Sequence, residues 1–319
     1  MAEEDFLVWL RERLAPDDPA VILGAGPDDC AYVSLAAGDL AFTSDTYVEG
    51  SHFTSETPPQ MVAAKVVAAT LSDLAASACR PRWVMLSLCF RRGIGEAWTR
   101  SFAEGVVESI RRFHITVIGG DTTSGENATT VSVFAVGQPL PGGPLTRAGA
   151  KAGDALVVTG SLGGSILGKH LNPEPRFAEM QALLDYKLSQ AGRRTLGAAM
   201  DISDGLALDL HRLARESGTG AEVVAGQVPL SAAAQTLAGK SGNSPLSHAL
   251  SDGEDFELLF TLDAEAWEGF GKWLATYPGS ASLAPFTRIG TLTSAAGLYL
   301  LGPGEAREEL TPSGYLHQW

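Results

Sequence analysis

Seven aspartates stand in short clusters flanked by glycine, serine or threonine, and each cluster adjoins an apolar run. Because apolar runs form cores, we expect these carboxylates to end near the interior or in a cleft. Buried carboxylates are rare unless they are paired or bind a metal. The chain offers too few nearby lysines and arginines to pair them, which favours a hard cation with oxygen ligands, above all Mg²⁺, and therefore phosphoryl chemistry. The seven are Asp28, Asp29, Asp45, Asp73, Asp121, Asp201 and Asp204.

Length and charge narrow the class of protein. A chain of 319 residues suits two domains, and a net charge of −14 argues against non-specific binding to nucleic acid or to an anionic membrane. No stretch approaches the roughly 20 apolar residues that span a bilayer. The acidic N-terminus lacks the basic residues of an export signal. Three scattered cysteines, Cys30, Cys79 and Cys89, fit small buried thiols in a cytoplasmic protein.

Strand-like and helix-like segments alternate in both halves, which predicts an α/β (α+β) protein. The first half shows helices at 5–14, 58–78 and 95–113, and strands at 31–35, 40–44, 83–90, 116–118 and 130–138. The second half shows strands at 155–159, 256–262, 287–292 and 297–301, with helices around 165–171, after 204 and around Trp267. The run Pro139–Pro144 has linker composition, so we predict domains at 1–140 and 145–319.

One segment imitates a phosphate-binding loop. Gly163–Lys169 fits the pattern G-x-x-x-x-G-K, but His170 replaces the hydroxyl residue that would hold magnesium. The adjacent Ile166 and Leu167 suggest a helix that buries an apolar face. The sequence therefore favours a strand-turn-helix connection over a phosphate loop.

Each aspartate motif also has an ordinary structural interpretation. Gly119–Asp121 fits a phosphate contact and a tight turn equally well. Taken alone, Asp201–Gly205 fits a helix N-cap better than a binding site, and Glu254 and His52 fit structural roles better. Asp73 is different, because it lies in a helix that is apolar nearly all round, where an unpaired charge is costly.

The combination of motifs is more specific than any one of them. In chain order they are D-D-C-A, T-S-D-T-x-V-E-G-S-H-F, L-S-D-L-A-A, G-G-D-T-T-S-G, L-T-R-x-G-A-K-x-G-D, D-I-S-D-G-L-x-x-D-L and G-E-D-F-E-L-L-F. This order resembles the thiamine-monophosphate kinase family, from about Gly24 to His317. The resemblance implies a two-domain aminoimidazole ribonucleotide synthetase-like fold with mixed sheets and flanking helices. It also implies a homodimer formed through the N-terminal strands, with ATP in the cleft between domains.

The resemblance assigns roles to individual residues. The implied magnesium shell is Asp29, Thr43, Ser44, Asp45, Asp73, Asp121, Asp201 and Asp204. Of these, Asp73, Asp121 and Asp204 are the implied catalytic residues. The implied ATP contacts are Gly120, Asp121, Arg147 and Ser203, with Arg147 as a charge-assisted donor to the phosphates. The residues expected to face thiamine monophosphate are His52, Glu254 and Tyr315.

The implied reaction is ATP-dependent phosphorylation of thiamine monophosphate by direct in-line transfer with several Mg²⁺ ions. Two alternatives remain. Another ATP-using synthetase of the superfamily is one, although selenide activation needs a reactive cysteine and Cys30 is the only candidate. A catalytically silent nucleotide-binding dimer is the other, which two of the departures from the family pattern suggest. Asp252 replaces the first glycine of G-G-E-D, and Pro312 stands where some relatives place a stacking tryptophan.

Overall fold

The computed structural model describes residue 8, residues 18–24 and residues 28–317, so all but residue 8 of the helix expected at 5–14 lies outside the described residues. The first half forms a six-stranded mixed sheet in the order β1-β2-β3-β6-β4-β5. Only the β4–β5 pair is parallel. The strands are β1 Val21–Leu23, β2 Ala31–Leu35, β3 Gly38–Val48, β4 Cys79–Arg91, β5 Thr116–Gly125 and β6 Thr130–Pro139.

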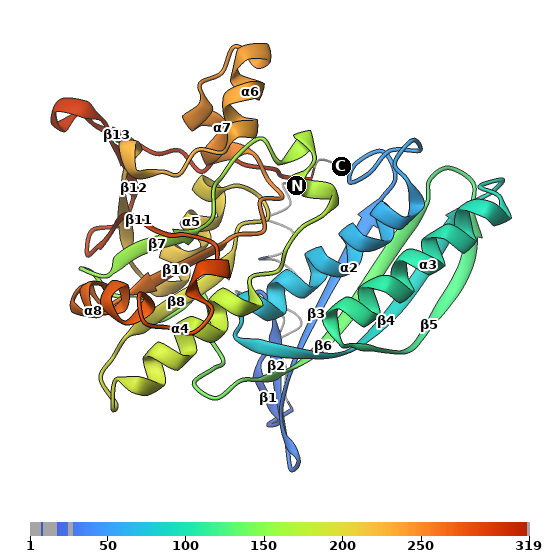
Figure 1. Ribbon diagram of the computed structural model, residues 1–319, viewed down its shortest axis with the longest axis horizontal. Coiled ribbons are helices and arrows are strands. Elements are labelled where there is room, and N and C mark those ends of the chain that lie inside the picture. The colour runs from blue at the N-terminus through green and yellow to red at the C-terminus, as the bar shows by residue number, and fades with distance from the viewer. Residues whose placement is uncertain (1–7, 9–17, 25–27, 318–319) are drawn as a thin grey trace.

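Helices α2 (Pro59–Ala76) and α3 (Glu96–Phe113) lie along one face of this sheet, as Figure 1 shows. Pro59 starts α2 without losing a hydrogen bond, because the first helical N–H has no partner within a helix. Strand β3 turns Tyr47 towards α2, where the tyrosine hydroxyl lies 3.1 Å from Thr70 Oγ1. Side chains alternate along a strand, so Thr46 points to the opposite face. We call that opposite, uncovered face the open face.

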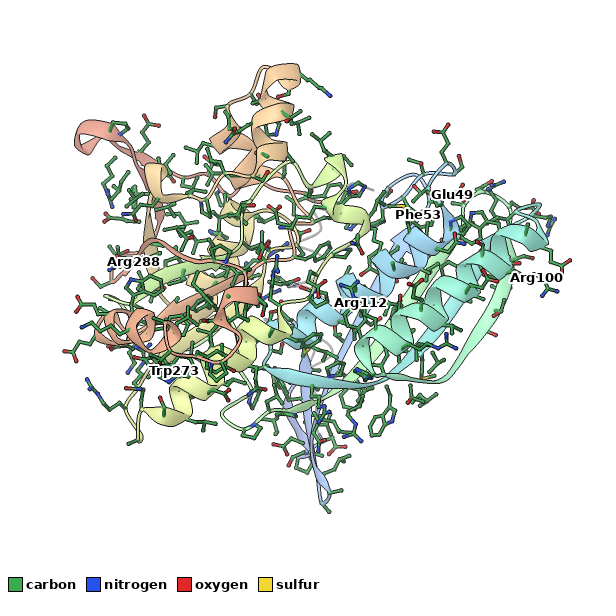
Figure 2. The ribbon with its side chains drawn as sticks, in the orientation of Figure 1. Glu49, Phe53, Arg100, Arg112, Trp273 and Arg288 are labelled. Carbon is green, nitrogen blue, oxygen red and sulfur yellow. The ribbon has the colours of Figure 1, made fainter. Side chains whose placement is uncertain are left out.

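The second half forms a seven-stranded mixed sheet in the order β13-β12-β9-β11-β7-β10-β8. Its strands are β7 Ala155–Thr159, β8 Leu196–Asp201, β9 Gly220–Val224, β10 Leu258–Leu262, β11 Phe286–Thr293, β12 Leu298–Leu301 and β13 Arg307–Glu309. Its helices are α4 Phe177–Ser189, α5 Leu206–Ser217, α6 Ala232–Ser241, α7 Pro245–Ser251 and α8 Ala264–Leu274. Figure 2 shows the side chains on the same view, with Trp273 of α8 labelled. The fully buried strand β7 sends Leu156 and Val158 into the core with α5, and Ala155 and Val157 into a second core with α4 and α8.

Helix α2 belongs to both halves of the molecule. Its C-terminal residue Ala76 packs in the same core as α4 and α8, while Val66 packs in the core of the first sheet. In return, Phe256 of the second half enters that first core. This interlocking brings the end of β8, at Asp201, to the side of α2 that carries Asp73.

The structure confirms most of the expected elements and corrects two. Strand β5 does not stop at the paired glycines but runs through them to Gly125. The glycines serve a close approach between strands, because a Cβ on Gly120 would lie 2.0 Å from the carbonyl oxygen of Leu86. The sequence did not predict strands β1, β9 and β13 or helices α4, α6 and α7, and it predicted only the end of strand β8. Within the described residues, no helix combines the length and apolar character needed to cross a membrane.

The segment after β7 is the second correction. The helix expected at 165–171 is replaced by two short 3-10 turns, Ser165–Leu167 and Lys169–Leu171. Gly164 (φ 72°) and Gly168 (φ 143°) interrupt any longer helix with positive backbone angles. The expectation that this segment is not a phosphate loop gains support from Lys169, whose ammonium group donates to Glu257 Oε1 at 2.7 Å.

Replacing Lys169 with methionine is therefore expected to weaken folding more than ATP binding. Glu257 is 1% exposed, so losing one of its cations should lower the free energy of unfolding by about 1–3 kcal/mol. The Michaelis constant for ATP should change no more than about twofold. Chemical denaturation and steady-state kinetics measure the two quantities, with the exposed Lys240→Met on α6 as the control. A loss of ATP affinity without a loss of stability would restore the phosphate-loop interpretation.

Candidate functional site

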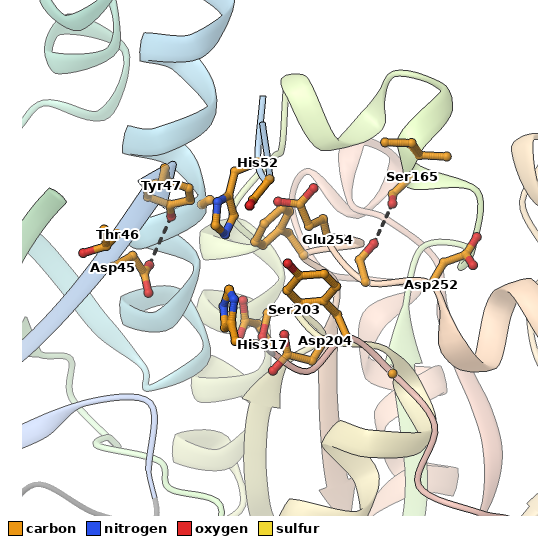
Figure 3. Close-up of a pocket in the computed structure, with 18 of the residues that line it drawn as sticks. Asp45, Thr46, Tyr47, His52, Ser165, Ser203, Asp204, Asp252, Glu254 and His317 are labelled. Atoms are coloured by element: carbon orange, nitrogen blue, oxygen red, sulfur yellow. Dashed lines mark hydrogen bonds between the residues drawn. The ribbon is translucent and has the colours of Figure 1, made fainter. Parts of the chain in front are cut away.

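A cavity of about 720 Å³ opens between the two halves of the molecule. Figure 3 shows side chains from β3, the following loop and the 252–256 segment converging on it, together with the C-terminal segment. Its lining residues include most of the predicted site residues, namely Ser44, Asp45, His52, Asp73, Asp201, Ser203, Asp204, Glu254 and Tyr315. Asp28, Asp29, Thr43, Gly120, Asp121 and Arg147 are not among them.

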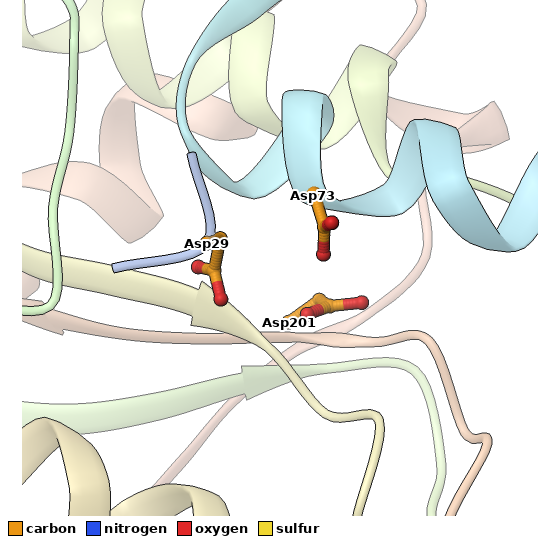
Figure 4. Close-up of side chains that lie close together, drawn as sticks. All are labelled: Asp29, Asp73 and Asp201. Atoms are coloured by element: carbon orange, nitrogen blue, oxygen red, sulfur yellow. The ribbon is translucent and has the colours of Figure 1, made fainter. Parts of the chain in front are cut away.

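Three carboxylates from distant parts of the chain meet beside this cavity (Figure 4). Asp29 precedes β2, Asp73 lies on α2 and Asp201 ends β8, and each offers an oxygen within 4.8 Å of the others. Burial, reinforced by the neighbouring negative charges, raises the pKa of Asp73 and of Asp201 well above the ordinary value. Burial also raises the pKa of Asp29. We call these three residues the carboxylate cluster.

The carboxylate cluster fits a divalent cation. Asp29 Oδ2 and Asp201 Oδ2 are buried and have no hydrogen-bond partner among the residues that the structure describes, which is costly unless something else satisfies them. Hard cations such as Mg²⁺ bind carboxylate oxygens of this kind, and a bound cation would also relieve the repulsion among the three charges. The chemistry of the donors therefore agrees with the metal predicted from the sequence.

Strand β3 supplies a second set of polar groups. Thr43 donates its hydroxyl hydrogen to Asp73, which turns the Asp73 carboxylate towards the strand. Asp45 accepts a hydrogen bond from the Tyr47 hydroxyl at 3.1 Å, and burial raises the pKa of Asp45. Ser44 lies between these residues and points to the open face. Thr43 and Asp45 thus adjoin the carboxylate cluster, whereas Ser44 reaches the cavity only from the other side of the strand.

The loop after β8 is shaped by a residue that the sequence reasoning did not use. Asp209, in the first turn of α5, accepts hydrogen bonds from the backbone N–H groups of Ser203 (3.1 Å) and Asp204 (3.0 Å). Gly205 is the actual N-cap residue, and no side chain caps the helix from there. The N-cap interpretation of Ser203 or Asp204 is therefore wrong. Asp209 holds the loop from inside the helix, so that Asp204 and Ser203 face the cavity.

Two arginines pair with the aspartates, which corrects the expectation that cations are lacking. Arg212 on α5 forms ion pairs with Asp204 and with Asp209. Arg147 donates from Nε to Asp29 Oδ1 at 3.1 Å and from its backbone N–H to Asp28 Oδ2 at 3.0 Å. Burial and the Asp29 charge raise the pKa of Asp28 to about 7. Arg147 thus lies against Asp29 Oδ1, while the other carboxylate oxygen of Asp29, Oδ2, accepts no hydrogen bond from the described residues.

Asp121 does not join the carboxylate cluster within one chain. Its strand β5 is an edge strand, and Asp121 is exposed, contrary to the expectation of a buried or cleft position. Across the sheet from β5 to β3, Asp121 on β5 lies opposite Ser87 on β4. Ser87 in turn lies opposite Ser132 on β6, and Ser132 lies opposite Thr46 on β3. Residues directly opposite one another share a face, so Asp121 points to the open face, three strands or about 14 Å from β3.

The other end of the cavity carries the residues predicted to face the acceptor. His52 Nδ1 accepts the backbone N–H of Val48 at 3.0 Å, which leaves the ring proton on Nε2. Burial lowers the pKa of His52, so the ring is neutral. Tyr315 is 48% exposed, and its backbone N–H donates to Asp204 O at 2.9 Å. The C-terminal segment is thereby attached to the same loop that positions Asp204.

The departures at Asp252 and Pro312 differ in position. Asp252 accepts a hydrogen bond from Gly164 N at 2.7 Å and lies 3.1 Å from His248 Nδ1, so it connects two loops beside the cavity. Pro312 is exposed in the C-terminal segment and does not line the cavity, whereas Tyr315 and His317 of the same segment do.

Comparison with known proteins identifies the family. Models of AIR synthase related proteins match residues 27–138 for the N-terminal domain and residues 151–300 for the C-terminal domain. The thiamine-monophosphate kinase of Rhodopirellula baltica is 34% identical and covers 99% of this chain and 97% of its own length. The chain belongs to the thiamine-monophosphate kinase family. The family member of Escherichia coli K12 is 35% identical, with 89% of each chain covered.

Solved structures agree with this family. The structure described as "AaThiL complexed with AMPPCP and TMP" matches with a TM-score of 0.81 and 26% identity, covering 99% of this chain and 97% of that chain. The thiamine-monophosphate kinase from Stenotrophomonas maltophilia K279a gives 0.72 and 31% identity, covering 96% and 98%. The E. coli hydrogenase maturation protein HypE, at 19% identity, shares the fold. The predicted family, fold and kinase class are thereby confirmed.

Proposed function

We propose that this protein transfers the terminal phosphoryl group of ATP directly to the phosphate of thiamine monophosphate. An acceptor phosphate oxygen forms a bond to the γ-phosphorus while the bond from that phosphorus to the bridging oxygen breaks. ADP leaves with that oxygen, and thiamine diphosphate is the product. The observation that carries the proposal is the carboxylate cluster beside a cavity shared by both halves, with Asp201 buried and Asp29 and Asp73 half-buried, in a member of this kinase family.

The protein contributes placement more than covalent chemistry. Both reacting phosphate groups are negatively charged and the attacking oxygen is already ionised, so the reaction needs alignment and charge balance rather than a protein nucleophile. Asp209 and Arg212 hold the loop of Ser203 and Asp204, and Arg147 orients Asp29. His52 presents its Nε2–H as a neutral donor at the acceptor end of the cavity.

The proposed magnesium ligands are the carboxylate cluster together with Asp45, Asp204 and the hydroxyl of Thr43. Ser44 points to the opposite face of β3, so a cation held by these ligands would not reach its hydroxyl group directly. When bound, Mg²⁺ supplies positive charge that neutralises the phosphate oxygens. Since these aspartates crowd one region, the ions would also stabilise the folded site itself.

The proposal is tested by measuring ADP release with ATP, Mg²⁺ and thiamine monophosphate, while chromatography follows thiamine diphosphate. Thiamine without phosphate and an acceptor-free reaction serve as comparisons. Equal amounts of ADP and thiamine diphosphate support the proposal. ADP release only with another acceptor would favour a different synthetase of the superfamily. Nucleotide binding without turnover would favour the silent dimer.

We further propose that the open face joins two copies of the chain into a homodimer. Phe42, Met85 and Phe134 are 37%, 43% and 44% exposed on three neighbouring strands of that face. Exposed apolar side chains grouped in this way mark interaction surfaces. Asp121 points to the same face, and Gly120 precedes it. Their proposed contact with the nucleotide and metal would therefore form at this interface.

Replacing Phe134 with glutamate is expected to separate the dimer, because two such charges would be buried at the interface. Sedimentation should give twice the 33.4 kDa chain mass for the wild type and the single mass for the variant. Val107→Glu on α3 is the matched control, since Val107 is 43% exposed on the covered side of the sheet. A wild-type monomer at micromolar concentration would refute the dimer.

A further inference from the structure

Lys65 is a fully buried lysine in the middle of α2. Its side chain is 0% exposed, and a lysine is almost never fully buried without a partner. The ammonium group lies 2.6 Å from Glu254 Oε1, and it donates to Glu254 Oε2 at 2.8 Å and to the carbonyl oxygen of His52 at 2.5 Å. A lysine ammonium has three N–H donors, so these three contacts account for all of them.

The backbone of Glu254 adopts an unfavourable conformation. Its φ angle is 61°, a left-handed conformation that is uncommon for residues other than glycine. Its backbone N–H donates to Ser203 O at 2.6 Å, which ties it to the loop that carries Asp204. The side chain is 28% exposed and lines the cavity. A strained backbone that is held in place at a cavity marks a residue whose direction matters.

The ammonium group of Lys65 links two loops from different halves of the molecule. His52 follows β3 in the first half, and Glu254 precedes β10 in the second, 189 residues from Lys65 along the chain. Figure 3 shows His52 and Glu254 on the same side of the cavity, near His317. One buried cation therefore sets the relative position of the two side chains that were predicted to face the acceptor.

We propose that Lys65 is a positioning residue for the acceptor, which holds the Glu254 carboxylate in place on the cavity wall beside His52. The inference rests on the proposed function, because it assigns this end of the cavity to the cationic ring system of thiamine monophosphate. A carboxylate on the cavity wall attracts positive charge, and the thiazolium ring carries positive charge. ATP, whose phosphates belong with the carboxylate cluster, does not depend on this contact.

The test is a double-mutant cycle with Lys65→Met, Glu254→Gln and the variant that carries both. Lys65→Met is expected to raise the Michaelis constant for thiamine monophosphate at least about tenfold, because it leaves the Glu254 carboxylate unpaired and mispositioned. The constant for ATP should stay within about twofold of the wild type. Because Lys65 acts through Glu254, the double variant should be no worse than the more affected single variant.

The double variant also covers the case in which Lys65→Met fails to fold, since it leaves no unpaired charge in the interior. Its affinity for thiamine monophosphate, measured by calorimetry, should then equal that of Glu254→Gln. Arg112→Met with Glu174→Gln is the matched control, because Arg112 on α3 and Glu174 before α4 form another ion pair between the two halves. That control should leave both Michaelis constants unchanged.

Two results would overturn this inference and leave the proposed function intact. One is a double variant whose Michaelis constant for thiamine monophosphate rises by the product of the two single-variant increases, which would mean that Lys65 does not act through Glu254. The other is an equal change in both Michaelis constants, or in neither. Absence of activity on thiamine monophosphate in the wild type would instead refute the proposed function, and this inference with it.

Discussion

Replacing Asp73 with asparagine is expected to lower turnover at least about 100-fold, the scale on which charge stabilisation at a reacting phosphate contributes. The same change should leave the metal-free protein at least as stable as the wild type. Asp73 lies within 4.8 Å of two other carboxylates, so removing its charge relieves repulsion in the absence of a cation. Steady-state kinetics and thermal melting in EDTA measure the two effects, and added Mg²⁺ should raise the melting temperature less than in the wild type.

Asp39→Asn is the matched control for this experiment. Asp39 begins β3 in the turn after β2, and its side chain accepts a hydrogen bond from Ser34 that asparagine can keep. Its turnover and its response to Mg²⁺ should equal those of the wild type. Near-normal turnover of Asp73→Asn would remove Asp73 from the site. A large fall in its melting temperature would show that the carboxylate is structural.

The metal-free protein is expected to lose stability as the pH rises from 6.5 to 8.5. Burial raises the pKa of Asp28 and of Asp209 from 3.8 to about 7, and raises the pKa values of Asp73 and Asp201 well above that ordinary value. The folded state therefore binds more protons than the unfolded state in this range, so the free energy of unfolding falls with rising pH. The melting temperature should drop by about 5 °C or more.

Magnesium should flatten this pH dependence, because the cation binds ionised carboxylates and its affinity rises as they lose protons. The chosen range lies above the ordinary histidine pKa of 6.5, so the neutral His52 contributes little change. Melting curves at four pH values, with EDTA and with Mg²⁺, provide the measurement. A melting temperature that rises with pH in EDTA would contradict the assigned pKa shifts. The variant Asp73→Asn should show a shallower slope.

Local pattern was sufficient to find the residues of the carboxylate cluster but not their geometry. Asp73 could be predicted because an acid inside an apolar helix demands a partner, and Asp201 because it ends a strand just before a helix. Asp121 has an equally suggestive motif, yet it points away from the cluster. The decisive facts are the strand order β6-β4-β5 and the pleat of each strand, and neither follows from the glycines around Asp121.

Long-range pairs were the other part that sequence inspection could not supply. Arg147 meets Asp29 across 118 residues, and Lys65 meets Glu254 across 189. A signal for Lys65 did exist, since a lone lysine in an apolar helix requires a carboxylate just as Asp73 requires a cation. The partner could not be named, because any acid on a loop of the second half satisfies that requirement. Asp209 and Arg212 are close in sequence and lie on one helix, so their i,i+3 spacing could have predicted their ion pair.

Helix α2 also fixes a distance along the cavity. It carries Lys65 at the proposed acceptor end and Asp73 in the carboxylate cluster, eight residues apart on one continuous helix. At 1.5 Å per residue, the helix fixes about 12 Å between them along its axis, and a helix does not stretch. A molecule whose charged ring and phosphate are separated by too short or too long a chain cannot satisfy both ends at once. Under the proposed function, the cavity would therefore select its acceptor by length as well as by charge.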